Sequence, residues 1–104
     1  NVMGPVKAAR ESSVRYRAHE RGGSNIRVNA ISAGAVQTRA ASGIKHFDDL
    51  LNESMRMAPL RRTVDACEVG RAALLLASDY ASGITGEVLH VDAGSHVSGM
   101  IFPE

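Results

Sequence analysis

Two short segments of this sequence have the residue pattern of β-strands, and a long stretch with helical patterns separates them. Residues 26–32 alternate branched apolar with polar side chains up to the turn former Gly34, and residues 86–91 form the second segment. Two strands joined by a long helical crossover are expected to be parallel, with a right-handed connection. The expected fold class is therefore α/β.

Two strands are few for a sheet of this kind, because parallel sheets normally contain several strands and are covered by helices on both faces. A chain of 104 residues with 44% hydrophobic content has the size of one small domain, or of part of one. We therefore expect residues 1–104 to be one part of a larger parallel sheet.

Three segments have helical patterns. Residues 2–21 carry a proline in the first turn, where its missing N–H is harmless, and two glycines follow as a stop. Apolar residues at helical spacing predict a second helix over residues 47–55. The third, residues 66–78, begins after the capping pair Asp65 and Glu68 and is apolar around most of its surface, so we expect it to be buried.

The composition disfavours several classes of function. A net charge of +1, with two tyrosines, two phenylalanines and no tryptophan, provides neither a basic surface nor a stacking platform for nucleic acids. The longest apolar run, residues 72–77, is far shorter than the roughly 20 residues of a membrane span. A single cysteine, Cys67, forms no internal disulfide, which fits a reducing compartment and makes the cytoplasm the expected location.

Three stretches together resemble the short-chain dehydrogenase/reductase superfamily in sequence, order and spacing, namely residues 1–7, 26–34 and 84–92. Within it, residues 38–44 followed by Phe47 are similar to the substrate-covering segment of the NADH-dependent enoyl-acyl-carrier-protein reductases. The resemblance extends from residue 1 to about residue 99. It implies a partial Rossmann-like fold, the C-terminal part of a single reductase domain with a doubly wound parallel sheet and crossover helices.

The spacing around Lys7 separates members of that superfamily. Most place a catalytic tyrosine four positions before the active-site lysine, where this chain has Met3. The enoyl reductases place it seven positions before, which falls immediately ahead of Asn1. The resemblance therefore implies that the tyrosine and the glycine-rich phosphate loop lie outside these residues, and that the isolated chain is inactive.

The implied activity is NADH-dependent reduction of trans-2-enoyl-acyl-carrier-protein in fatty acid biosynthesis. Lys7 is the implied catalytic residue and contacts the nicotinamide ribose, while the Val36 backbone meets the carboxamide and Thr38 lies near the pyrophosphate. The implied cofactor residues are Lys7, Ala33, Gly34, Val36, Thr38, Arg39 and Ala40. Plainer alternatives stay open, because a lone helical lysine is usually a solvated charge and Thr38 fits an ordinary turn as a helix cap.

The resemblance also implies a pocket for the acyl chain, on a segment that orders over bound cofactor and substrate. Its residues are Ala40, Ala41, Ile44, Phe47 and Leu50. By pattern alone, such residues are more commonly the buried face of an amphipathic helix. An acyl carrier protein is the implied partner, although Lys45 in this segment is followed by the acidic Asp48 and Asp49.

Arg10, Arg17 and Arg21 share one stripe of the first helix, where similar enzymes are usually apolar and face a partner subunit. The resemblance implies a homotetramer, and guanidinium groups buried in its interface would be costly unless paired. A solvated basic face is the alternative. Two other functions also stay open, namely a different short-chain reductase, such as one acting on 3-oxoacyl thioesters, and a non-catalytic interaction module.

The histidines and the cysteine receive no functional role. No two histidines share one helical face beside a carboxylate, so a metal site is not expected from His19, His46, His90 and His96. His90 is expected in a strand with its side chain hydrogen-bonded. Cys67 is expected as a small core residue rather than a nucleophile.

Overall fold

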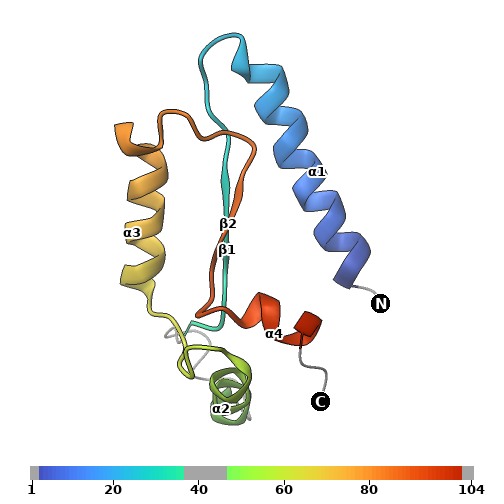
Figure 1. Ribbon diagram of the computed structural model, residues 1–104, viewed down its shortest axis with the longest axis vertical. Coiled ribbons are helices and arrows are strands. Elements are labelled where there is room, and N and C mark those ends of the chain that lie inside the picture. Colours follow the sequence, from blue (N-terminus) through green and yellow to red (C-terminus); the bar gives the residue numbers. More distant parts are fainter. Residues whose placement is uncertain (1–2, 37–46, 102–104) are drawn as a thin grey trace. The chain divides into compact units, whose positions relative to one another are not determined.

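The computed structural model describes residues 3–36 and 47–101 (Figure 1). The elements in chain order are α1 (Met3–Gly22), β1 (Ala30–Ala33), α2 (Phe47–Met57), α3 (Ala66–Ala77), the 3-10 helix η2 (Asp79–Ala81), β2 (Val88–Val91) and α4 (Ser95–Ile101). The predicted order of a helix, a strand, two helices and a strand is confirmed, and η2 and α4 are additional elements. No helix in these ranges has the length and apolar character required to cross a membrane.

Strands β1 and β2 form a two-stranded sheet. The Ala30 N–H donates to the Glu87 carbonyl at 2.9 Å, and the Gly34 N–H donates to the Val91 carbonyl at 3.0 Å. The residue numbers of donors and acceptors rise together, so the strands run parallel (Figure 1). The parallel pairing predicted from the long crossover is therefore confirmed.

The chain divides into two compact units, each with its own packing. The first comprises Asn1–Ile31 and Leu74–Leu89. In this unit Ala18 is 6% exposed, and a Cβ added to Gly86 would lie 3.5 Å from the Ala18 side chain. Val28 donates its N–H to the Thr85 hydroxyl at 3.1 Å instead of to a backbone carbonyl. The regular strand therefore begins later than the alternating pattern predicts.

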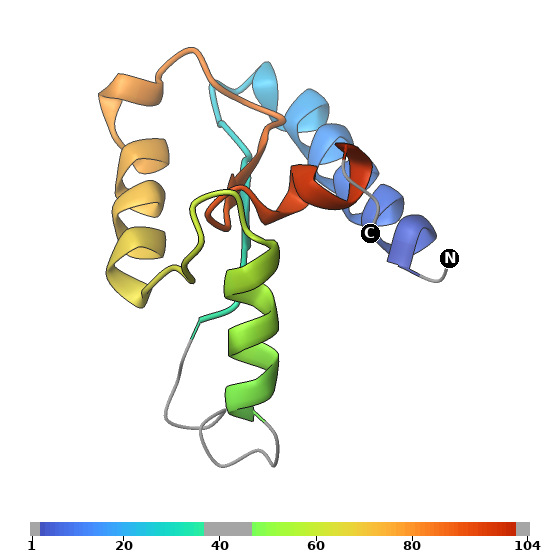
Figure 2. The same ribbon diagram turned by 60° about the horizontal axis from the view of Figure 1, so that its bottom comes forward.

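The second unit comprises Ser32–Ala73 and His90–Glu104. Its core is a small apolar cluster made of Ala58, Val64 and Ala93, with Val36, Val69 and Val91 packed against it. The Ser98 hydroxyl donates to the Met57 carbonyl at 2.7 Å and so joins α4 to the end of α2, which Figure 2 shows in red and green. This core holds the end of β2 beside the segment between α2 and α3.

The predicted capping pair at the start of α3 is confirmed. The Glu68 N–H donates to the Asp65 carboxylate at 2.8 Å, and the Asp65 N–H donates back to the Glu68 carboxylate at 3.1 Å. The Arg62 guanidinium adds two hydrogen bonds to Glu68, at 2.8 and 3.0 Å, and these bonds lower the pKa of the Glu68 carboxyl. The helix thus starts where two backbone N–H groups donate to two carboxylates, those of Asp65 and Glu68.

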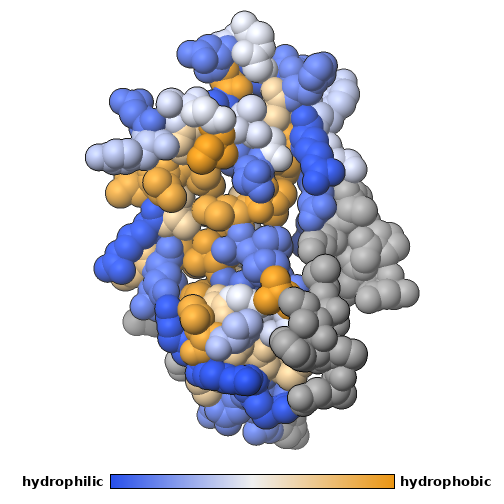
Figure 3. Space-filling view, in the orientation of Figure 1, coloured by the Kyte–Doolittle hydropathy of each residue, from blue (hydrophilic) through white to orange (hydrophobic). Residues whose placement is uncertain are grey.

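The prediction that this third helix is buried is wrong for the chain as it stands. None of the residues of α3 is buried, and Leu74 and Leu75 are 71% and 47% exposed. Cys67 is also exposed, which corrects its expected place in a core. Figure 3 shows apolar side chains at the surface of the face drawn. An apolar sequence indicates a preference for burial, but burial requires a covering element, and the two-stranded sheet covers little surface.

Candidate functional site

The loop that follows β1 lies at the carboxyl end of that strand, where open α/β sheets bind their ligands. Gly34 opens this loop and stands very close to Asp92, which follows β2. A Cβ added to Gly34 would lie 2.8 Å from both the Cα and the Cβ of Asp92. Only glycine allows this approach, so the two strand ends meet at one point.

A hollow lies beside this point within the second unit. It is lined by Ala35, Glu53, Ser54, Met57, Ala58, Arg62, Thr63, Val64, Asp92 and Ser95. The lining combines apolar side chains from the end of α2 with two carboxylates and one guanidinium. A ligand here would contact both the loop after β1 and the turn after β2.

The predicted site residues differ in how far the structure describes them. Ala33 is exposed, while Gly34 and Val36 are half-buried in the loop after β1, and Val36 packs against the core of the second unit. Leu50 lies on α2 with 61% of its surface exposed, and it does not line the hollow. Lys7 lies on α1 and Phe47 begins α2, and their side chains are not described. Outside the described residues lie Thr38, Arg39, Ala40, Ala41 and Ile44.

Asp92 is a polar residue of this region to which the sequence reasoning gave no role of its own. Its carboxylate accepts hydrogen bonds from the Gly94 N–H at 2.9 Å and from the His96 N–H at 3.2 Å. Burial acts to raise the pKa of the Asp92 carboxyl, but the hydrogen bonds from His96 and Gly94 outweigh burial and leave the pKa below its usual value. Asp92 is therefore an ionised, anchored carboxylate at the end of β2.

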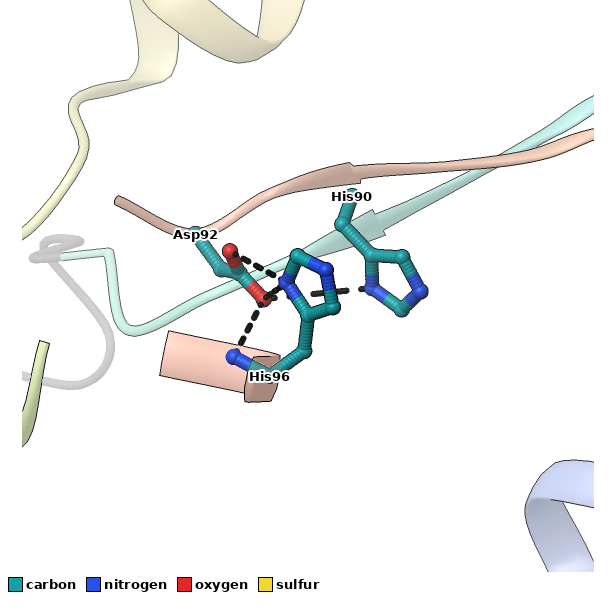
Figure 4. A group of neighbouring side chains, drawn as sticks. All are labelled: His90, Asp92 and His96. Carbon is teal, nitrogen blue, oxygen red and sulfur yellow. Dashed lines mark hydrogen bonds and ion pairs between the residues drawn. The ribbon is translucent and has the colours of Figure 1, made fainter. Parts of the chain in front are cut away.

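Two histidines converge on Asp92 (Figure 4). The His96 Nδ1 lies 3.0 Å from Asp92 Oδ2, and the His90 Nδ1 lies 3.8 Å from the same oxygen. The His90 Nδ1 is buried without a hydrogen-bond partner among the described residues, so the prediction of a hydrogen-bonded His90 is wrong at that atom. The spacing argument considered one helical face, whereas here a strand supplies one histidine and a helix supplies the other.

A parallel strand pair joined by a helical crossover, with its polar groups at the carboxyl ends of the strands, is typical of the Rossmann-like α/β class. The sequence profile of the family described as enoyl-(acyl carrier protein) reductase matches residues 1–96. The chain belongs to this family.

Individual relatives agree with that assignment. The enoyl-acyl-carrier-protein reductase (NADH) of Nostoc sp. is 57% identical over 100 residues, which cover 96% of this chain and 39% of the relative. The corresponding NADPH-named protein of Staphylococcus aureus is 52% identical over 96 residues, which cover 92% of this chain and 38% of the relative. The crystal structure of the Anaplasma phagocytophilum reductase with NAD has a TM-score of 0.81 at 54% identity, covering 96% of this chain and 38% of that one. The chain thus spans well under half the length of the proteins it matches.

Proposed function

We propose that residues 1–104 are the C-terminal part of a single Rossmann-like reductase domain. The whole enzyme would use NADH to reduce trans-2-enoyl-acyl-carrier-protein in fatty acid biosynthesis, in the cytoplasm. The observation that carries the proposal is the family match over residues 1–96, combined with relatives named as enoyl reductases at 57% and 52% identity. The chain's 39% share of the Nostoc protein makes the activity a property of the larger domain.

The loop after β1 suits a dinucleotide in its position and its lack of bulk. It leaves the carboxyl end of a parallel strand, Gly34 carries no side chain, and Ala35 lines the hollow beside it. When bound, NADH supplies a hydride to the β-carbon of the enoyl thioester. The protein's task is then to orient the nicotinamide and to stabilise the negative charge that develops on the thioester oxygen.

Within this proposal the residues of the chain divide into two sets. Lys7 holds the nicotinamide ribose and favours the developing negative charge. The cofactor set is Lys7, Ala33, Gly34, Val36, Thr38, Arg39 and Ala40, and the acyl-chain set is Ala40, Ala41, Ile44, Phe47 and Leu50. Leu50 is exposed in the described chain. This exposure is consistent with an acyl-chain pocket whose remaining walls come from other parts of the complete enzyme.

The activity is tested in the complete polypeptide that carries this chain. We expect NADH to be oxidised when a crotonyl thioester is supplied, measured as the loss of NADH absorbance. Replacing the tyrosine seven positions before Lys7 with phenylalanine should lower the rate about 100-fold or more, because one donor to the oxyanion is lost. Absence of oxidation, or a rate indifferent to this replacement, contradicts the proposal. A 3-oxoacyl thioester should give no NADH oxidation. Oxidation with that substrate would instead favour the alternative short-chain reductase.

The choice of NADH over NADPH is part of the proposal. The Nostoc relative is named for NADH and the Staphylococcus aureus relative for NADPH, at 57% and 52% identity. NADH is the more frequent cofactor in the names of the similar proteins, which favours NADH. Comparing kcat/KM for the two nucleotides in the same crotonyl assay tests this choice, and a higher value for NADPH would reverse it.

We further propose an acyl carrier protein as the substrate carrier and a homotetramer as the assembly. Arg10, Arg17 and Arg21 are exposed on α1 in the described chain. In a tetramer that packs this stripe between subunits, the guanidinium groups would lose water, which is costly unless each is paired as Arg21 is with Glu20 at 3.6 Å. The arginines would then weaken the assembly.

Arg17→Leu is therefore expected to shift the complete polypeptide toward the tetramer, with the dissociation constant lowered about tenfold or more because a desolvated charge is removed. Sedimentation velocity across a concentration series measures this shift. Arg15→Leu is the matched control, since Arg15 lies on α1 off the stripe and within 4.0 Å of Glu11. Equal sedimentation of the parent and Arg17→Leu would show that the stripe is solvated.

A further inference from the structure

The group of His90, Asp92 and His96 has the composition of a metal-ligand set. One nitrogen from each histidine and one carboxylate oxygen all lie within 4.8 Å of one another. In Figure 4 the two imidazole rings lie on the same side of the β2 end as the Asp92 carboxylate. The carboxylate side chain is 8% exposed and that of His90 is 21% exposed, so the group is partly shielded from water.

The Asp92 oxygen and each of the two histidine Nδ1 atoms are already near the spacing of neighbouring ligands in a tetrahedral site. Bonds of about 2.0–2.1 Å to zinc place neighbouring ligand atoms about 3.3 Å apart. Asp92 Oδ2 lies 3.0 Å from the His96 Nδ1 and 3.8 Å from the His90 Nδ1. Two imidazoles and one carboxylate, with a position left for water, are ligands that zinc accepts in proteins.

The His90 Nδ1 and the Asp92 carboxylate both have features that favour binding such an ion. The Nδ1 is buried and makes no hydrogen bond within the part of the chain that the structure describes, and a metal bond would remove the cost of this unpaired atom. The carboxylate is held by the backbone N–H groups of Gly94 and His96, at 2.9 and 3.2 Å. Such outer hydrogen bonds fix the orientation of a metal-binding carboxylate.

One rearrangement is required. The rings of His90 and His96 stack with centroids 4.0 Å apart and an interplanar angle of 9°, and the lone pairs of two parallel rings do not meet at one point. The His96 side chain is 36% exposed and lies at the start of α4, so it has room to tilt out of the stack. The Asp92 carboxylate, anchored from the backbone, stays in place during this movement.

We propose that His90, Asp92 and His96 bind one divalent cation of the zinc class, through two imidazole nitrogens and one carboxylate oxygen. The ion joins the end of β2 to the start of α4. The three residues are not among those proposed for cofactor and substrate, although Asp92 also adjoins Gly34 and lines the hollow beside it.

The test is Zn²⁺ binding to the complete polypeptide, first stripped of metal, by competition with a chromophoric chelator. We expect one ion per chain, and a ligand-field absorption band when Co²⁺ replaces Zn²⁺. His96→Ala should weaken Zn²⁺ binding about 100-fold or more, since losing a direct ligand costs at least as much as losing an outer-shell partner. His19→Ala is the control, because His19 is exposed on α1 and belongs to no such group in the described chain.

A second variant guards against a loss of folding. Asp92→Asn removes the negative charge and the acceptor for the His96 N–H but keeps an oxygen for the Gly94 N–H, so the turn after β2 retains one of its two bonds to this side chain and Zn²⁺ should bind more weakly than to the parent. Circular dichroism checks the fold of each variant. Absence of stoichiometric Zn²⁺ binding, or equal affinities for the parent and His96→Ala, would overturn the proposal.

Discussion

Gly34→Ala is expected to lower the free energy of unfolding of the complete polypeptide by about 1–3 kcal/mol, the range for overpacking at a tightly packed position. The added methyl group would lie 2.8 Å from the Cα and the Cβ of Asp92. The Cα belongs to the backbone, so no side-chain rotation relieves the contact. The strand ends must separate instead, which stretches the 3.0 Å hydrogen bond from the Gly34 N–H to the Val91 carbonyl.

Urea unfolding followed by circular dichroism measures this change. Gly83→Ala provides the matched control, because a Cβ at Gly83 meets no described atom within 4 Å. That variant should be close to neutral or slightly more stable, since alanine restricts the unfolded chain. If Gly34→Ala unfolds at the same urea concentration as the parent, the close approach of the two strand ends is not a constraint on the fold. The proposed role of Gly34 in the cofactor loop also predicts weaker NADH binding by Gly34→Ala.

Lys7→Met should lower kcat/KM for NADH-dependent reduction of a crotonyl thioester about 100-fold or more. The proposed task of Lys7 is to hold the nicotinamide ribose and to place a positive charge near the developing oxyanion, and the loss of one such donor has this magnitude. Methionine matches lysine in length and in helix propensity, so α1 (Met3–Gly22) should be unaffected. The measurement is the initial rate of NADH oxidation at several substrate concentrations.

Lys7→Arg is the control that keeps the charge, and it should retain more activity than Lys7→Met. NADH binding, followed by nucleotide fluorescence, separates a defect in holding the cofactor from a defect in the chemical step. An unchanged kcat/KM for Lys7→Met would mean that Lys7 is an ordinary solvated surface charge. The enoyl reductase proposal would survive that result if the tyrosine expected ahead of Asn1 were required for activity, so the two failures are distinguishable.

The secondary structure of this chain was largely predictable, because it depends on short stretches of sequence. Alternation over residues 26–32 predicted the first strand, and residues 86–91 were assigned as the second. The length of their connection predicted parallel pairing, which the bonds from Ala30 and Gly34 confirm. The Asp65 and Glu68 pair marked the start of α3 correctly, since a capping box satisfies backbone N–H groups within one turn. Membership of the reductase family followed from the same local segments.

Burial and the grouping of side chains were decided by the tertiary structure. Apolar residues predicted a buried third helix, yet Leu74 is 71% exposed, because burial needs a partner surface that a helix cannot provide for itself. His90 lies on a strand and His96 on a helix, so neither the helical nor the strand periodicity of the sequence places them on one face. They meet at Asp92 because the chain reverses at Ala93 and Gly94, where φ is 57° and 88°. The sequence by itself thus determined the elements and the family, while the turn after β2 decided which side chains share a site.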